Sequence, residues 1–118
     1  MKLITAIVRQ EKLDELVQAL IDKGARGMTV TDVRGFGQQH GHLIGTAARV
    51  TGSDGGRMAV LLAKVRLDLV VLDDDAKTIV EVIAKHARTE TIGDGKIWVT
   101  PVDSALRVRT GERDRAAV

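Results

Sequence analysis

Apolar residues along this chain recur first with the spacing of a strand and then with that of a helix. Residues 3–8 form an apolar run of strand length. Residues 11–23 then repeat apolar side chains at intervals of three and four, which predicts an amphipathic helix. Gly24 favours the end of that helix. The apolar stripe comprises Leu13, Leu16, Val17, Leu20 and Ile21.

Two later segments, 28–34 and 65–71, alternate apolar and polar residues with period two. This pattern predicts two half-buried strands that could pair as neighbours. Asp73 and Asp74 are favourable N-cap residues and predict the start of a second helix. A final strand is predicted at 96–101. The stripe of the second helix comprises Ala76, Ile79, Val80, Ile83 and Ala87.

The order of these elements is β-α-β-β-α-β, which predicts an α+β, ferredoxin-like fold. In that fold two helices cover one face of a four-stranded antiparallel sheet. The other face must be wetted or covered by another subunit. A chain of 118 residues forms one domain, 1–118, and is of marginal size when isolated, which favours an oligomer.

The connection between the two middle strands is unusually long. Residues 37–63 carry no sustained period, whereas loops longer than about 12–15 residues are uncommon in compact domains and usually functional or disordered. Its tip, 51–57, is rich in glycine and polar residues, while 58–62 is apolar enough either to extend the following strand or to dock on another surface. We therefore expect this connection to form an effector surface.

Composition excludes several classes of protein. The chain has no cysteine, so it offers neither a disulfide framework nor a cysteine-based zinc site. Its net charge is only +2, with basic and acidic residues interleaved, which argues against nucleic acid as the main partner. RNA-binding ferredoxin-like sheets stack bases on aromatic residues, but only Phe36 and Trp98 are present here. No apolar run approaches the roughly 18 residues of a membrane span, so we expect a cytoplasmic protein without membrane insertion.

A glycine-rich turn and two nearby arginines could bind an anion. Gly93 and Gly95 can direct backbone N–H groups toward a phosphate, and Lys96 adds a charge. In a strand, Arg107 and Arg109 would project from one face and could grip a phosphate. From these residues alone, an ordinary hairpin turn and a solvated strand face remain open as alternatives.

The same residues allow other functions to be considered: an enzyme, a metal site, or simple surface and packing roles. A phosphate loop could serve an enzyme, but the chain has no Walker-type motif and no evident nucleophile and base, so we expect no enzyme; slow ATP hydrolysis is the enzymatic alternative. His40 and His42 lack a third ligand, so no zinc site is assigned. Lys64 alone would be an exposed lysine, and Trp98 a core or intersubunit packing residue.

Four segments, in this order, resemble PII signal-transduction proteins: GMTVT at 27–31, GFGQQHGH at 35–42, IGDGKI at 92–97 and RVRTGE at 107–112. The resemblance covers nearly the whole chain. It implies a non-enzymatic homotrimer that binds ATP or ADP between subunits. In the family, 2-oxoglutarate joins through a Mg²⁺ ion held by ATP, and a T-loop docks on a target transporter or enzyme. Residues 37–63 match this T-loop, 89–96 the phosphate-binding B-loop and 102–118 the C-terminal segment.

The resemblance also implies particular site residues. Gln39 and Lys64 are expected to bind 2-oxoglutarate, with Gln39 also helping to coordinate Mg²⁺. One of the two arginines would come from the neighbouring subunit. The residues expected to bind the nucleotide are Thr29, Gly35, Gly37, Gln38, Asp68, Val70, Thr89, Gly93, Asp94, Gly95, Lys96, Arg107 and Arg109.

This chain departs from the family at several positions. It has no tyrosine, which excludes the tyrosyl nucleotidylation known in many bacterial members. Gln38 stands where an arginine is common, and Glu90 stands where the B-loop usually has glycine. A carboxylate beside a triphosphate is repulsive unless it points away. The expected role is nitrogen regulation; the alternative is a sensor for carbon or ion transport that prefers ADP or AMP and does not bind 2-oxoglutarate.

Overall fold

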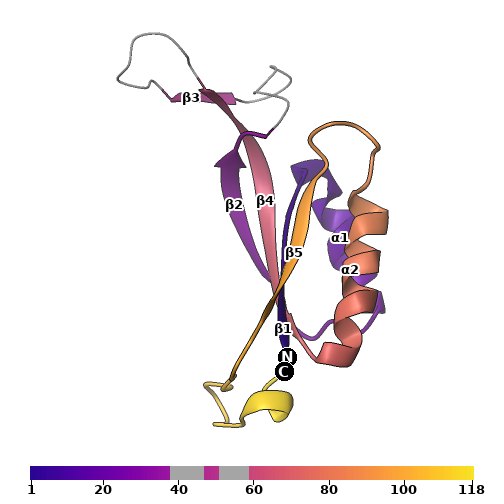
Figure 1. Cartoon of the computed structure of the whole chain (residues 1–118), viewed down its shortest axis with the longest axis vertical. Helices are drawn as coiled ribbons and strands as arrows, with labels where there is room; N and C mark the ends of the chain where they lie inside the picture. The colour runs from indigo at the N-terminus through magenta and orange to yellow at the C-terminus, as the bar shows by residue number, and fades with distance from the viewer. Residues whose placement is uncertain (38–46, 51–58) are drawn as a thin grey trace.

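The structure is a computed structural model that describes residues 1–37, 47–50 and 59–118. A sheet stands beside two helices, and a hairpin arm extends from one end of the sheet (Figure 1). The strands are β1 (Lys2–Val8), β2 (Thr29–Gly35), β3 (Ala47–Val50), β4 (Ala59–Val71) and β5 (Gly95–Pro101), and the helices are α1 (Leu13–Asp22) and α2 (Asp73–Ala87).

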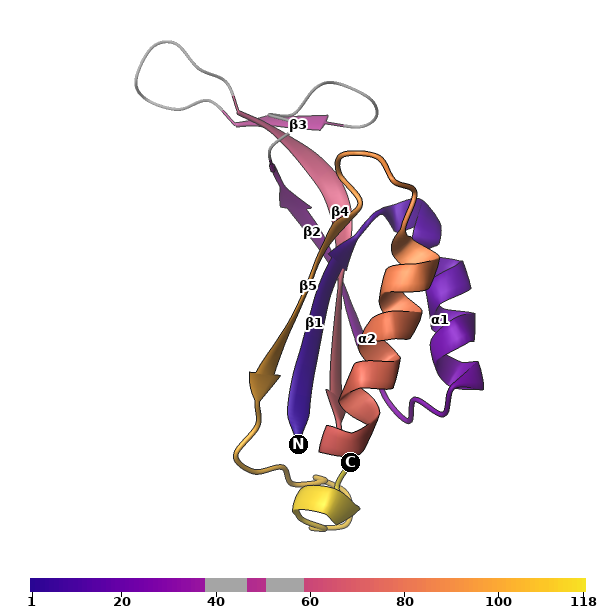
Figure 2. The ribbon, with the colours of Figure 1, turned by 45° about the vertical axis from the view of Figure 1, so that its right-hand side comes forward.

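The four long strands form an antiparallel sheet in the order β2-β4-β1-β5. Ile4 lies opposite both Leu69 of β4 and Val99 of β5, and Thr29 of β2 lies opposite Asp68 of β4. Both helices cover the same face of the sheet (Figure 2). The ferredoxin-like α+β fold and the predicted pairing of the two middle strands are therefore confirmed.

The core lies between that face and the helices. Alternate residues of β1 and β4 point into it, as the period of two requires. Each large aliphatic side chain buried there stabilises the fold by about 1.5–3 kcal/mol. The largest side chains that are almost completely buried in this core are Ile4, Val8, Leu16, Leu20, Val65, Leu67, Leu69 and Ile83.

The first helix begins two residues later than the apolar pattern predicts. A 3₁₀ turn, Gln10–Lys12, precedes α1, and no side chain caps either element. The predicted end is confirmed: Gly24 has φ +84°, its N–H donates to the Ile21 carbonyl at 2.9 Å, and the Ala25 N–H donates to the Leu20 carbonyl at 3.0 Å. These two bonds form a Schellman motif, in which the left-handed residue is normally glycine.

The predicted N-cap of the second helix is wrong. Leu72 occupies the cap, and Asp73 and Asp74 lie in the first helical turn. The reason is that β4 continues to Val71, which leaves a single residue between strand and helix. The carboxylates still favour this helix end electrostatically, and Asp73 also pairs with the amino terminus of Met1 at 3.0 Å.

Two described parts of the long connection, 47–50 and 59–62, form strands. β4 begins at Ala59 and runs for 13 residues, and β3 pairs with its first part. The predicted extension of the following strand is thus confirmed over 59–62. This part of β4 lies beyond Val65, the last residue that pairs with β1.

The two arginines of the C-terminal segment do not lie in a strand. The segment closes on itself: the Arg107 N–H donates to the Glu112 carbonyl at 2.9 Å, and the Gly111 N–H donates to the Arg107 carbonyl at 2.8 Å. Gly111 has φ +73°, which permits this reversal of the chain. The expectation that Arg107 and Arg109 project from one strand face is therefore wrong, because a tight turn replaces the strand.

Candidate functional site

The face of the sheet opposite the helices carries a polar network. Thr5, buried within the sheet, donates to Asp68 Oδ1 at 2.7 Å, and Arg66 Nε donates to Asp68 Oδ2 at 2.7 Å. The Arg66 hydrogen bond, aided by Thr5, lowers the pKa of Asp68 although burial opposes it. Trp98 lies opposite Thr5 and is 41% exposed, so it belongs to this open face and not to the core.

The B-loop, which connects α2 to β5, is organised around the carboxylate of Asp94. Oδ2 accepts the backbone N–H groups of Thr89 at 2.7 Å and Glu90 at 2.9 Å, while Oδ1 accepts the Thr89 hydroxyl and Arg9 Nε, the latter at 3.1 Å. Burial raises the pKa of Asp94, but the bonds from Thr89, Arg9 and Glu90 outweigh it and hold the pKa well below its usual range. The turn is therefore fixed by an ionised side chain, and it is not a simple hairpin.

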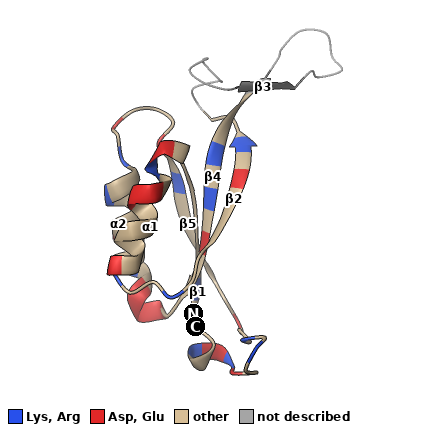
Figure 3. Ribbon diagram, turned by 180° about the vertical axis from the view of Figure 1, so that it is seen from behind, with Lys and Arg blue, Asp and Glu red and all other residues tan. Residues whose placement is uncertain are grey.

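Two cations, Arg9 directly after β1 and Lys64 within β4, hold carbonyl groups of the B-loop. Arg9 Nη2 donates to the Ile92 carbonyl at 2.8 Å, and Lys64 Nζ donates to the Gly93 carbonyl. Burial, followed by the charge of Arg9, lowers the pKa of Lys64. Lys64 is thus half-buried and engaged, unlike an ordinary exposed lysine. Figure 3 shows basic segments on β4 and β5 close to this connection.

Between the base of the T-loop and the B-loop lies a hollow of about 600 Å³, which we call the B-loop hollow. It brings together seven predicted site residues from three separate stretches of the sequence, and Phe36 adds an exposed aromatic ring. Gln38 and Gln39 lie outside the described residues. The hollow is lined by Ile7, Gly35, Phe36, Gly37, Lys64, Thr91, Ile92, Gly93, Asp94, Gly95 and Lys96, of which Gly35, Gly37, Gly93, Asp94, Gly95 and Lys96 were expected to bind nucleotide and Lys64 to bind 2-oxoglutarate.

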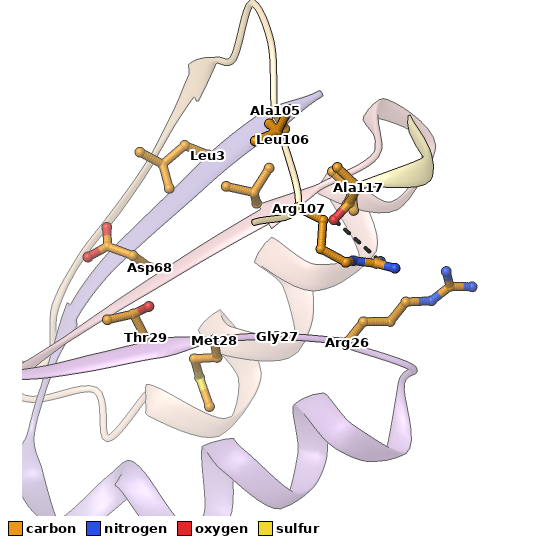
Figure 4. Close-up of a pocket in the computed structure, with 12 residues that line it drawn as sticks. Leu3, Arg26, Gly27, Met28, Thr29, Asp68, Ala105, Leu106, Arg107 and Ala117 are labelled. Carbon is orange, nitrogen blue, oxygen red and sulfur yellow. Dashed lines mark hydrogen bonds between the residues drawn. The ribbon is translucent and has the colours of Figure 1, made fainter. Parts of the chain in front are cut away.

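A second hollow of about 460 Å³, the C-terminal hollow, lies toward the other end of the sheet (Figure 4). Arg107 lines it and pairs with Glu112 at 2.7 Å. Arg109 lines neither of these two hollows. The C-terminal hollow is lined by Leu3, Arg26, Gly27, Met28, Thr29, Asp68, Val70, Ala105, Leu106, Arg107, Ala117 and Val118, which include the expected nucleotide residues Thr29, Asp68, Val70 and Arg107.

The backbone of the B-loop explains its glycines. Gly93 and Gly95 have φ +103° and +108°, values that L side chains rarely adopt. A Cβ added to Gly95 would also lie 1.7 Å from the Ile7 carbonyl oxygen. Glu90 has φ +62°, so it keeps a left-handed conformation despite its side chain. It is exposed and does not line the B-loop hollow, and neither does Thr89, which acts through Asp94.

Two basic residues near these hollows escaped the sequence reasoning. Arg9 is the first residue after β1 and reaches the B-loop across more than 80 residues of sequence. Arg26 precedes β2 and lines the C-terminal hollow near Arg107 (Figure 4). The available signal was their position at strand ends, but such arginines are common on exposed surfaces, so position alone does not identify a contact.

The described part of the chain offers little to hold Mg²⁺ by itself. Asp94 is the one carboxylate among the described residues that line the B-loop hollow, and its oxygens already accept bonds from Thr89, Glu90 and Arg9. Mg²⁺ prefers oxygen ligands and is often held largely by the phosphates of its substrate. The described residues that line this hollow therefore do not form a protein cage for Mg²⁺ by themselves.

Comparison with known proteins identifies the family. A family model described as "Nitrogen regulatory protein P-II" matches residues 1–112. The chain belongs to the PII family. It is 48% identical to Nitrogen regulatory protein P-II 2 of Methanothermobacter thermautotrophicus over 120 aligned residues, covering 100% of this chain and 97% of the relative. It is 45% identical to Nitrogen regulatory protein P-II 1 of Escherichia coli strain K12 over 118 residues, covering all of both chains.

Membership in the PII family sets the class of function. PII proteins are nitrogen-regulatory signalling proteins and not enzymes, and the family as a whole binds adenylate nucleotides and acts on target proteins. Among the described residues, no helix is long and apolar enough to cross a membrane. The resemblance noted from the four sequence motifs is therefore confirmed.

Proposed function

We propose that this PII protein is a homotrimer that binds ATP or ADP between subunits and regulates a target transporter or enzyme through its T-loop. The observation that carries the proposal is the division of the expected nucleotide residues between two hollows. The B-loop hollow holds glycine N–H groups and Lys96, which suit phosphates. The C-terminal hollow holds Thr29, Asp68 and Arg107.

A neighbouring copy could complete the site by presenting its C-terminal hollow to the B-loop hollow. The open face of the sheet supplies surface for such an assembly, because Val70 and Trp98 are 40% and 41% exposed there. Exposed apolar groups beside a polar network are typical of surfaces that subunits bury. Arg107, which Glu112 already orients, would then contact phosphate from the adjacent subunit.

Lys64 is the described residue best placed to recognise 2-oxoglutarate. Its ammonium group donates to the Gly93 carbonyl inside the B-loop hollow, and a carboxylate would compete for the same protons. Because a dianion must bind beside an anionic nucleotide, a cation and Mg²⁺ are both required to offset the repulsion. We assign the second carboxyl group and the metal to Gln39 together with the nucleotide phosphates.

Calorimetric titration tests the nucleotide site, and sedimentation measures the assembly. We expect ATP and ADP each to bind a trimer at micromolar to submillimolar concentration, and 2-oxoglutarate to bind only with Mg-ATP. Absence of binding of either nucleotide at millimolar concentration would contradict the proposal. The cytoplasm, where these nucleotides are available, is the compartment in which we place the protein.

One observation supports a second candidate, a sensor of carbon or ion transport that prefers ADP or AMP. Glu90 stands exposed within the B-loop, and a carboxylate near the phosphates disfavours the most highly charged nucleotide. Titration of the native protein and of Glu90→Gly with ATP, ADP and AMP separates the two candidates. Tighter binding of ATP than of both others, unchanged by the substitution, would exclude this second candidate.

A further inference from the structure

Arg9 is the one basic residue among those described whose side chain donates hydrogen bonds to several groups of the B-loop, including a long one of 3.5 Å to the Thr91 hydroxyl. Its Nε donates to Asp94 Oδ1 at 3.1 Å and its Nη2 donates to the Ile92 carbonyl at 2.8 Å. The side chain is 25% exposed, and Glu11 lies 4.0 Å from its third nitrogen. The planar guanidinium suits this arrangement, because its donors diverge in a fixed fork.

The bond to Ile92 has a consequence for the next residue. In a trans peptide the N–H of Gly93 points opposite to the Ile92 carbonyl. Because the Ile92 carbonyl points toward Arg9, the Gly93 N–H points away from Arg9. Lys64 holds the Gly93 carbonyl in the same way. Among the described residues the Gly93 N–H has no hydrogen-bond acceptor, which leaves it available to a ligand.

We propose that Arg9 is a positioning residue of the nucleotide site: it fixes the Ile92–Gly93 peptide so that the Gly93 N–H stands ready for a phosphate oxygen. Arg9 does not line the B-loop hollow itself, so it acts through the loop and not by touching the ligand. Donors that are oriented before binding avoid the entropy of ordering the loop when the anion arrives. This role rests on the proposed nucleotide function.

If Arg9 had only a general structural role, its substitution would have a different effect. If Arg9 only tied the connection between α2 and β5 to the sheet, its loss would lower the stability of the whole chain, and nucleotide affinity would follow stability. A positioning role instead predicts a local effect, in which the B-loop amides open while the core strands keep their protection. Hydrogen exchange resolved by residue distinguishes the two.

The experiment uses three variants of the full chain. Arg9→Gln removes both charged contacts, and Arg9→Lys keeps the charge but not the fork. Lys77→Gln removes the same charge from an exposed site on α2 and serves as the control, since Lys77 is 88% exposed. Amide exchange of residues 89–95 is measured without nucleotide, and the dissociation constant for ADP is measured by calorimetry.

We expect Arg9→Gln to accelerate exchange of the hydrogen-bonded B-loop amides of Thr89, Glu90 and Asp94 at least tenfold and to weaken ADP binding about tenfold or more. The exchange rates and the ADP affinity of Arg9→Lys should lie between those of Arg9→Gln and the native protein, and those of Lys77→Gln should equal the native values. Unchanged B-loop exchange in Arg9→Gln, or acceleration spread evenly through β1 and β4, would overturn the role. If Arg9→Gln fails to fold, amide exchange and ADP affinity of Arg9→Lys test the role instead. If the native protein binds neither ATP nor ADP, the proposed function fails, whereas the exchange data still decide whether Arg9 orders the loop.

Discussion

The B-loop hollow and the C-terminal hollow differ in how their residues are held. In the B-loop hollow, groups from β1, β4 and the α2–β5 connection are tied together by Asp94, Arg9 and Lys64. In the C-terminal hollow, Arg107 is tied only within its own segment, to Glu112 and weakly to the Ala117 carbonyl. Long-range bonds therefore fix the B-loop within a single chain, whereas Arg107 is held by bonds within its own segment; the sheet side of the second hollow, at Asp68, is held by Thr5.

This difference suggests a division of labour in the proposed site. A phosphate cradle needs backbone N–H groups at fixed positions, which a network anchored to the sheet can supply. The C-terminal segment is a short turn on one end of the molecule, and it needs only to present an oriented arginine to a neighbour (Figure 2). Pairs of substitutions, one in the B-loop and one in the C-terminal segment, test this difference.

Glycine to alanine substitution should show the largest contrast. At Gly95 a Cβ would overlap the Ile7 carbonyl, so we expect Gly95→Ala to lower the free energy of unfolding by more than about 3 kcal/mol. At Gly111 nothing lies within 4 Å of the added Cβ, so only the left-handed backbone is strained and the loss should be about 1 kcal/mol. Urea unfolding measures both, and equal losses would contradict the account of the two turns.

Removing the charge of Asp94 or of Glu112 should give a smaller contrast in stability. Asp94→Asn places an amide where one oxygen accepts two backbone N–H groups, and we expect a loss of about 2 kcal/mol in the free energy of unfolding. Glu112→Gln weakens a half-exposed ion pair, for which we expect less than about 1 kcal/mol. Thermal or urea unfolding of the two variants provides the test. A larger loss of stability for Glu112→Gln than for Asp94→Asn would contradict the account that the B-loop is the more firmly held segment.

Acid should remove the contribution of the Asp94 charge. Its pKa is lowered in the folded protein, so its stabilisation is complete above the ordinary aspartate pKa of about 3.9 and is lost as the pH falls toward the lower folded value. The difference in unfolding free energy between the native protein and Asp94→Asn should therefore be constant from pH 7 to 5 and shrink toward pH 3. A difference that grows as the pH falls would show that the Asp94 charge does not stabilise the folded protein.

The smallest effects should come from the two left-handed residues that are not glycine. Glu90, with φ +62°, makes no side-chain hydrogen bond among the described residues, so Glu90→Gly should raise the free energy of unfolding by about 0.5–1 kcal/mol. Asp114, with φ +51°, accepts the Ala105 N–H at 3.2 Å, and aspartate tolerates this conformation better. Asp114→Gly should therefore be neutral or slightly destabilising in the same unfolding assay; stabilisation as large as that of Glu90→Gly would count against this reasoning.

The sequence pattern predicted the core of the fold well because burial imposes a period. Leu16 and Leu20 of α1 and Leu67 and Leu69 of β4 occupy the expected faces. The pattern did not predict β3, and it failed at the C-terminal turn, where Gly111 reverses the chain. The N-cap of α2 was misplaced because the length of β4, and not the capping preference of Asp73, decides where the helix starts.

The candidate site was predicted through its motifs and not through its contacts. Gly93, Gly95 and Lys96 are recognisable from local sequence, and the structure adds Lys64 to the same hollow. Arg9 could not be identified in this way, because its partners lie more than 80 residues away and nothing local distinguishes it from a surface arginine. Long-range ties of this kind become visible only when the strand register is known.

The central claim is that one nucleotide site is built from the B-loop hollow of one subunit and the C-terminal hollow of another. Mixing two variants tests it: Lys96→Ala damages the first half and Arg107→Ala the second. Each variant alone should bind ADP at least tenfold more weakly than the native protein. In trimers assembled at random from equal amounts of both, about a quarter of the sites should combine two intact halves and regain native affinity. Calorimetry of the mixture should detect these sites; if no tight sites return, the site is not shared between subunits and the account is wrong.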